Sequence, residues 1–187
     1  MTTSQHHSAA NPLEYRVLTR ADVACFRQLR AAMLADTPEA FGSSPQDEAS
    51  FSDAEWEARI APSDNALIIG AFAGDHLKGC AGVFRHRPQK MAHKATIWGV
   101  YVDPAIRGRG AARSLMVRAI EQAGRLPGVR QITLNVTGSN EVAFQLYSSL
   151  GFELCGEEPD ALQVDGKFYA EKHMFLRLAE PSPPPSR

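Results

Sequence analysis

The stretch that decides the fold is VYVDPAIRGRGAA, residues 100–112. It begins as the apolar end of a predicted strand, breaks at an Asp-Pro pair, and turns through two glycines into a helix predicted over 110–124. Gly108 and Gly110 permit positive φ and let the backbone approach a ligand closely. The first amides of the helix lack intrahelical partners, and the helix dipole favours an anion there. The turn therefore predicts a phosphate-binding site.

Two common phosphate-binding loops fit this turn poorly. A P-loop requires a Lys-Ser/Thr pair after its second glycine, and this chain has none there. A dinucleotide-binding fingerprint requires a third glycine where this chain has Arg113, and it opens a parallel sheet, whereas antiparallel strands are predicted before this turn. Arg107 and Arg109 add positive charge, and Ala111 and Ala112 keep the helix entrance small. These features suit a diphosphate.

The elements before the turn favour antiparallel pairing. The apolar pattern predicts a short strand over 15–18, a helix that Thr19 or Asp22 caps and that ends before Thr37-Pro38, and a second helix from Ser52 or Asp53 to Ile60 with a Ser52/Glu55 capping box. Strands follow over 66–72, 77–84 and 95–102, and their short connections imply that they run antiparallel.

The elements after the turn complete a mixed sheet. A strand over 132–136 is reached through a crossover helix, which favours a parallel arrangement with the strand before the turn. Asn140 caps a further helix that Gly151 closes, and the last strands are predicted over 152–154 and 168–178. We therefore predict an α/β fold with a mixed sheet, antiparallel first and parallel at the glycine turn, flanked by helices.

The decisive stretch resembles the acetyl-CoA-binding motif Arg/Gln-x-x-Gly-x-Gly/Ala of the GNAT N-acetyltransferase superfamily, with Arg107, Gly110 and Ala112 at its fixed positions. A second block also matches the family in order and spacing: Leu134-Asn135-Val136, Asn140, Ala143, Leu146-Tyr147 and Gly151-Phe152. The resemblance covers roughly residues 15–178. It implies a GNAT-like sheet whose parallel strands splay apart at the CoA site.

The resemblance also implies roles for individual residues, with acetyl-CoA as co-substrate. The amides of the glycine turn would hold the CoA diphosphate, a role that falls to Arg107, Gly108, Arg109, Gly110, Ala111 and Ala112. The preceding strand, Val100, Tyr101 and Val102, would pair its backbone with the pantetheine arm, and an amide near Val100 would bind the developing oxyanion. Asn140 would contact CoA as well as cap its helix. Tyr147 would protonate the departing thiolate, although its spacing also suits a core aromatic.

The proton acceptor for the attacking amine stays open. A lysine-like amine, with a pKa of ~10.4, is almost entirely protonated at pH 7 and must lose a proton before it attacks. Many members of the family carry a glutamate on the strand before the turn, but residues 96–102, TIWGVYV, contain no acid. Glu171, His173 or a chain of waters are the alternatives. Trp98 either lines the acceptor pocket or packs in the core, and the loop 37–42 is predicted on the acceptor side.

The predicted activity is transfer of an acetyl group to a primary amine, on a small molecule or a protein, by direct attack. The alternative is a catalytically silent acyl-CoA-binding regulatory module. Lysine plus arginine number 20 against 21 acids, which gives no footprint for general nucleic-acid or membrane binding. Cys25, Cys80 and Cys155 form no CxxC pair, and the histidines form no HExxH motif, so no metal site is predicted.

The ends of the chain are predicted to be disordered tails, polar over 1–12 and proline-rich over 180–187, around a single domain over 13–179. No apolar run approaches the ~20 residues that a membrane span requires. We expect a cytoplasmic protein, and we leave open whether it forms a homodimer.

Overall fold

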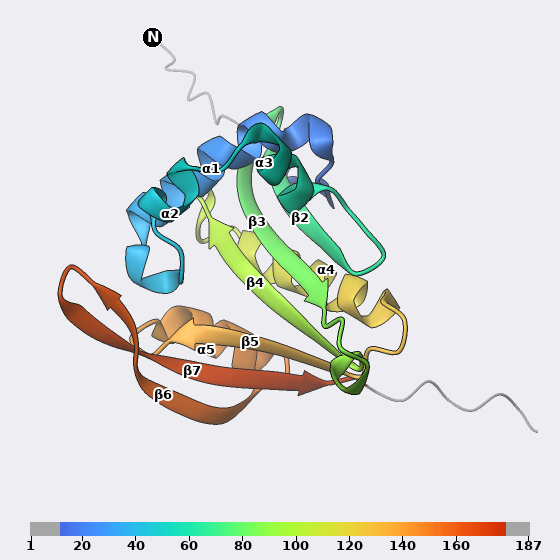
Figure 1. The fold of residues 1–187 in the computed structure, drawn as a ribbon, viewed down its shortest axis with the longest axis vertical. Helices are drawn as coiled ribbons and strands as arrows, with labels where there is room; N and C mark the ends of the chain where they lie inside the picture. The colour runs from blue at the N-terminus through green and yellow to red at the C-terminus, as the bar shows by residue number, and fades with distance from the viewer. Residues whose placement is uncertain (1–11, 179–187) are drawn as a thin grey trace, which may run out of the picture.

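A computed structural model describes residues 12–178 as a seven-stranded sheet in the order β1-β2-β3-β4-β5-β7-β6 (Figure 1). Only β4 and β5 are parallel neighbours, and all other neighbours are antiparallel. This arrangement confirms the predicted mixed sheet. The strands are β1 Glu14–Val17, β2 Ala66–Ala73, β3 His76–Arg85, β4 Lys94–Val102, β5 Gln131–Thr137, β6 Glu153–Val164 and β7 Lys167–Arg177.

The predicted tails over 1–12 and 180–187 lie outside the described residues, apart from Pro12. The single domain over 13–179 stays a prediction.

Helices cover both faces of the sheet, and an apolar cluster lies on each side. The helices α1 Val23–Asp36 and α3 Asp53–Ile60 pack on one face, with α2 Pro45–Ala49 beside them. The helices α4 Ala111–Arg125 and α5 Glu141–Ser149 pack on the other face. Four short 3₁₀ segments connect these elements: η1 Arg20–Asp22, η2 Pro38–Ala40, η3 Gln89–Met91 and η4 Pro104–Ile106.

The predicted helix caps are largely confirmed. Ser52 and Glu55 form the capping box of α3, with the Ser52 amide donating to Glu55 Oε2 at 2.7 Å and the Glu55 amide donating to Ser52 Oγ at 3.3 Å. The helix α2 was not predicted, although its own signal is in the sequence, because Ser44 and Asp47 form a second capping box around Pro45 at the first helical position. This five-residue helix carries Glu48, which is buried.

The parallel strands β4 and β5 diverge, as predicted. They pair only from Lys94 to Thr96 on β4 and from Gln131 to Thr133 on β5. At the last paired position the Thr96 and Thr133 hydroxyls lie 2.9 Å apart. Beyond it the two strands no longer pair with each other, although β4 stays paired with β3 and β5 with β7, and Figure 1 shows the wedge that opens between their carboxyl ends.

A bulge in β4 lies inside this wedge. The register with β3 passes from Gly82 opposite Trp98 to Cys80 opposite Tyr101, so β4 holds one extra residue there. Gly99 has a φ of 60°, a left-handed conformation that favours glycine. The bulge therefore redirects the β4 backbone at the point where the strand leaves its parallel neighbour.

The last two strands form a longer hairpin than the sequence pattern indicates. The prediction of a strand ending at Leu154 is wrong, because β6 continues to Val164 and joins β7 through an Asp165-Gly166 turn, with φ of 49° and 79°. The first half of the missed part, 156–160, is exposed and has no apolar alternation, and Ala161, Leu162 and Val164 beyond it are half-buried. The register shifts at Leu154/Gly156 and at Glu158/Leu162, and Pro159 lies within the second shift on this edge strand.

Candidate active site

A groove of about 720 Å³ fills the wedge between the diverging strands. Its walls come from the end of β4, the glycine turn and start of α4, the end of β5, α5, and the loop after α1. All of the residues predicted to bind the cofactor or act in catalysis line it except Arg109: Val100, Tyr101, Val102, Arg107, Gly108, Gly110, Ala111, Ala112, Asn140 and Tyr147. These residues, which lie between positions 100 and 147 in the sequence, therefore surround one cavity.

The glycine turn has the conformation that the sequence predicts. Gly108 and Gly110 have φ of 73° and 76°, and a Cβ on either would meet no atom within 4 Å. Gly110 is the N-cap of α4, and Ala111, Ala112 and Arg113, whose amides precede the first intrahelical bond, line the groove. An open backbone at a helix start suits a diphosphate.

The Arg107 side chain holds the fold together at the groove. Its Nε donates to the Val102 carbonyl at 2.9 Å, and its guanidinium pairs with Asp36 at the end of α1. It also lies 5.7 Å from the Tyr101 ring centroid. Asp36 offsets the charge of Arg107, whose side chain fixes the exit of β4 against α1.

Asn140 and Tyr147 both combine a structural contact with a place in the groove. The Asn140 Oδ1 accepts from the Ala143 amide at 3.1 Å, which confirms the predicted cap of α5. Tyr147 is buried, with 6% of its surface exposed, and its ring packs on Phe152 at a centroid distance of 6.2 Å. Burial raises the pKa of Tyr147 to about 12. Its hydroxyl therefore carries its proton at every physiological pH.

A smaller cavity of about 60 Å³ adjoins the groove at its inner end. Tyr147, Val100 and Phe41 line both cavities, whereas Trp98 and Asn135 line only the inner one. Trp98 packs against the cluster under α1 and α3 and also lines this cavity; its role in an acceptor pocket stays a prediction.

Asn135 joins the two side chains considered as proton acceptors. Its Nδ2 donates to Glu171 Oε2 at 3.2 Å, and its Oδ1 lies 2.9 Å from His173 Nδ1. Because Glu171 orients the amide, His173 Nδ1 faces an acceptor and must carry a proton. His173 Nε2 lies 3.2 Å from Glu158 Oε2 on β6. Sequence reasoning missed Asn135 as a site residue, and only the register that sets it opposite His173 reveals it.

The loop after α1 closes over the groove. Thr37, Glu39, Ala40 and Phe41 line it, and the Thr137 hydroxyl on β5 donates to the Glu39 carbonyl at 2.8 Å. This hydrogen bond joins η2 to β5 beyond the point where β5 stops pairing with β4. The structure therefore places the predicted acceptor-side loop at the wedge.

The described residues contain no group of three or more His, Cys, Asp or Glu side chains arranged to hold a metal ion. Between residues 12 and 178, no helix is long and apolar enough to cross a membrane.

Gly110→Ala is expected to weaken acetyl-CoA binding at least tenfold, because the new Cβ would stand on the open backbone that is predicted to hold the diphosphate and would disfavour the left-handed φ. Gly128→Ala is the matched control. Gly128 has a φ of 73° and an equally open Cβ position, but it does not line the groove. Both variants should lose about 1 kcal/mol of stability. Calorimetric titration with acetyl-CoA should separate them, and equal affinities would remove Gly110 from the binding site.

Comparisons with known proteins identify the family of this chain. The family model described as Acetyltransferase (GNAT) family matches residues 26–152. The N-alpha-acetyltransferase RimI of Mycobacterium tuberculosis is 31% identical over 156 residues, 83% of this chain and 87% of that protein. An uncharacterized protein of Mycobacterium leprae is 33% identical over 171 residues, which cover 90% of this chain but only 42% of that protein.

A solved structure shares the fold. The protein yncA of Salmonella typhimurium, whose structure contains acetyl-CoA as its cofactor, superposes with a TM-score of 0.78 at 22% identity, covering 95% of this chain and all of that one. The matched family model spans the glycine turn, the diverging strands and α5. The chain belongs to the GNAT acetyltransferase family.

Proposed function

We propose that this protein transfers an acetyl group from acetyl-CoA to a primary amine by direct attack. The observation that carries the proposal is the wedge between β4 and β5, which has an open helix start at one end and Tyr147 and Asn135 at the other. A long thioester lying along this wedge would present its acetyl group near the β4 bulge. The acceptor would reach it from the side of Asn135.

In this arrangement the amides from residue 107 to 112 hold the diphosphate, and the unpaired edge of β4 from Val100 to Val102 binds the pantetheine arm. Asn140, at the start of α5, is a further CoA contact. Arg109 lies outside the groove lining, and we keep it as a contact for the exposed end of CoA.

The reaction needs two proton movements. The amine nitrogen attacks the thioester carbon, a C–N bond forms, and the C–S bond breaks. A backbone amide at the bulge near Val100 stabilises the oxyanion. The Tyr147 hydroxyl donates to the departing sulfur, and the proton of the amine passes through water to the Glu171 carboxylate, which the Asn135 amide orients. The products are an N-acetylated amine and CoA thiol.

The alternative function is a catalytically silent acyl-CoA-binding module. The observation that favours it is that β4 carries no acidic side chain to accept the amine's proton. Calorimetry with acetyl-CoA, together with a thiol-release assay over a panel of amines, tests both. The panel should include N-terminal peptides, because the related RimI is an N-alpha-acetyltransferase. We expect micromolar binding and thiol release with at least one amine. Binding without turnover over the whole panel would favour the silent module, and absence of binding would overturn both functions.

A further inference from the structure

Arg59, in the last turn of α3, stands out in the hydrogen bonding of the protein. Among the described residues, its Nε is the one buried side-chain nitrogen or oxygen without a hydrogen-bond partner. Buried polar groups are normally satisfied, and an unpaired guanidinium nitrogen costs free energy. The Arg59 guanidinium, with its unpaired Nε, is therefore a candidate for a functional role.

The surroundings of Arg59 carry excess positive charge. Glu48 on α2 is held mainly by Arg30 on α1, whose Nη2 lies 2.7 Å and whose Nε lies 3.0 Å from Glu48 Oε1. The side chains of both partners are about 5% exposed. Arg59 reaches the same carboxylate only at 3.3 Å. Two guanidiniums therefore share one carboxylate, and burial, with Arg30 as a further cause, lowers the pKa of Arg59. An added anion would be stabilised here.

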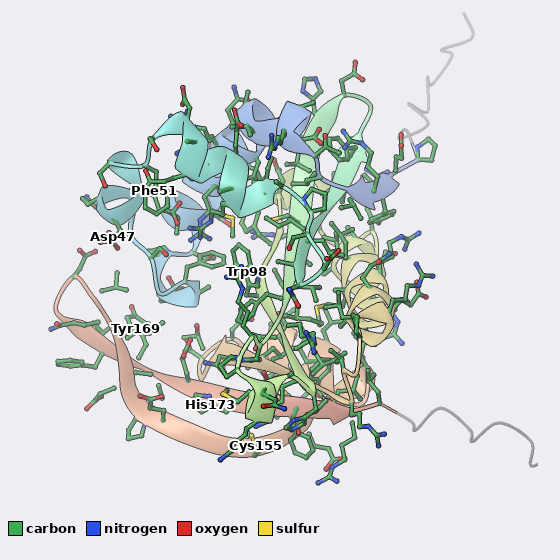
Figure 2. All side chains as sticks on the ribbon, turned by 45° about the vertical axis from the view of Figure 1, so that its right-hand side comes forward. Asp47, Phe51, Trp98, Cys155, Tyr169 and His173 are labelled. Carbon is green, nitrogen blue, oxygen red and sulfur yellow. The ribbon has the colours of Figure 1, made fainter. Side chains whose placement is uncertain are left out.

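Arg59 itself lines neither cavity, but it packs on Trp98, which lines the inner one. Its guanidinium carbon is 5.2 Å from the Trp98 ring centroid, and Trp98 lines that cavity. The Trp98 indole packs directly on Gly82, where an added Cβ would come within 2.3 Å of the ring. The Arg59 side chain keeps 24% of its surface exposed, so it stays accessible. Figure 2 shows Trp98 between Phe51, on the side of the N-terminal helices, and His173 on β7.

The opposite side of the inner cavity has the reverse chemistry. Asn135 lines it and holds Glu171 and His173, and Glu158 follows behind His173. Asn135 is the member of this network that lines the cavity, and its Oδ1, with the carboxylates of Glu171 and Glu158 behind it, can accept hydrogen bonds from an ammonium group. A cation on the Trp98 side and carboxylates on the Asn135 side together match a molecule that carries both charges.

We propose that the acceptor is an amino-acid-like zwitterion whose carboxylate binds Arg59 and whose amine lies toward Asn135. This inference rests on the proposed acetyl transfer and names its substrate class. Arg59 acts as a specificity-determining residue that positions the amine, and Phe41 and Trp98 contribute apolar surface around the acceptor side chain.

Paired substrates test the carboxylate directly. The assay compares leucine with leucinamide and phenylalanine with phenylalaninamide, each by kcat/KM. Amidation also changes the basicity of the amine, so the informative quantity is the preference of the wild type divided by that of a variant. Arg59→Gln should reduce the preference for the free acid about tenfold or more, as expected for loss of a charge-assisted hydrogen bond. Arg59→Lys should keep part of the preference.

Arg27→Gln is the matched control. Arg27 also lies over a tryptophan, Trp56, and pairs with an acid, Asp53, but Trp56 lines neither cavity. The Arg27→Gln variant should prefer the free acid over the amide by the same factor in kcat/KM as the wild type. A preference for the amides, or an equal fall for both substrates in Arg59→Gln, would overturn the inference and leave acetyl transfer standing.

Binding supplies a second readout. Calorimetry of leucine with the CoA-loaded protein should show an affinity that Arg59→Gln reduces and that leucinamide does not match. No thiol release with any amine would count against the proposed activity itself. No binding of leucine would count against the role of Arg59.

Discussion

Tyr147→Phe is expected to lower kcat by about tenfold to a hundredfold and to change the KM for acetyl-CoA by no more than about twofold. The variant removes one hydroxyl from the inner end of the groove and keeps the ring that packs on Phe152. Binding of the diphosphate and the pantetheine arm does not use this hydroxyl, so the loss should fall on the step in which the thiolate departs.

The size of the loss follows from acidity. Burial raises the pKa of Tyr147 to about 12, whereas a thiol has a pKa of about 8.5. Complete proton transfer from the tyrosine to a free thiolate is therefore uphill by roughly 5 kcal/mol. The hydroxyl can still stabilise charge on the departing sulfur by donating a hydrogen bond. CoA thiolate is also a fair leaving group by itself, so we expect a moderate loss.

A profile of kcat against pH from 6 to 10.5 checks this assignment. The wild-type rate should show no falling limb from Tyr147 below about pH 11, because the raised pKa keeps the hydroxyl protonated. Tyr15→Phe, on β1 and outside both cavities, controls for loss of a tyrosine hydroxyl and should retain the wild-type kcat. Equal kcat in Tyr147→Phe and the wild type would remove Tyr147 from the mechanism.

The parts of the site that the sequence predicts are those that depend on local chain geometry. The positive φ of Gly108 and Gly110, the start of α4 and the cap at Asn140 each follow from a few neighbouring residues. Such positions can be predicted from the sequence because turn and cap chemistry depends on neighbouring residues only. They mark the end of the groove at which acetyl-CoA is proposed to bind.

The acceptor end depends on contacts between distant segments, which a single sequence does not reveal. Asn135 meets His173 only because β7 pairs with β5 in one register, and Glu158 reaches His173 only across the shifted pairing of β6 and β7. Arg59 on α3 and Trp98 on β4 lie 39 positions apart and meet only in the tertiary fold. The motif therefore predicts the co-substrate, and the tertiary fold supplies the hypothesis for the acceptor.

The same tertiary contacts make Glu48 a strong determinant of stability, and Glu48→Leu is expected to lower the free energy of unfolding by about 3–5 kcal/mol. Glu48 is buried on α2 and bonds to Arg30 on α1 and Arg59 on α3, so one carboxylate ties three helices together. Its removal leaves two guanidiniums in a poorly solvated site without a counter-charge. The midpoint of thermal unfolding should fall by roughly 10 °C or more.

Urea unfolding of a small set of variants separates charge from packing. Glu57→Leu replaces an exposed carboxylate on α3 and should stay within about 0.5 kcal/mol of the wild type. The double variant Arg30→Met/Glu48→Leu removes the closely paired charges together and should recover part of the loss, because replacing a buried ion pair by apolar side chains is often nearly neutral, whereas Arg59 still lacks its counter-charge. A loss below about 1 kcal/mol in Glu48→Leu would contradict the counter-charge role. Partial recovery in the double variant would show that the loss in Glu48→Leu comes from uncompensated positive charge and not from lost packing.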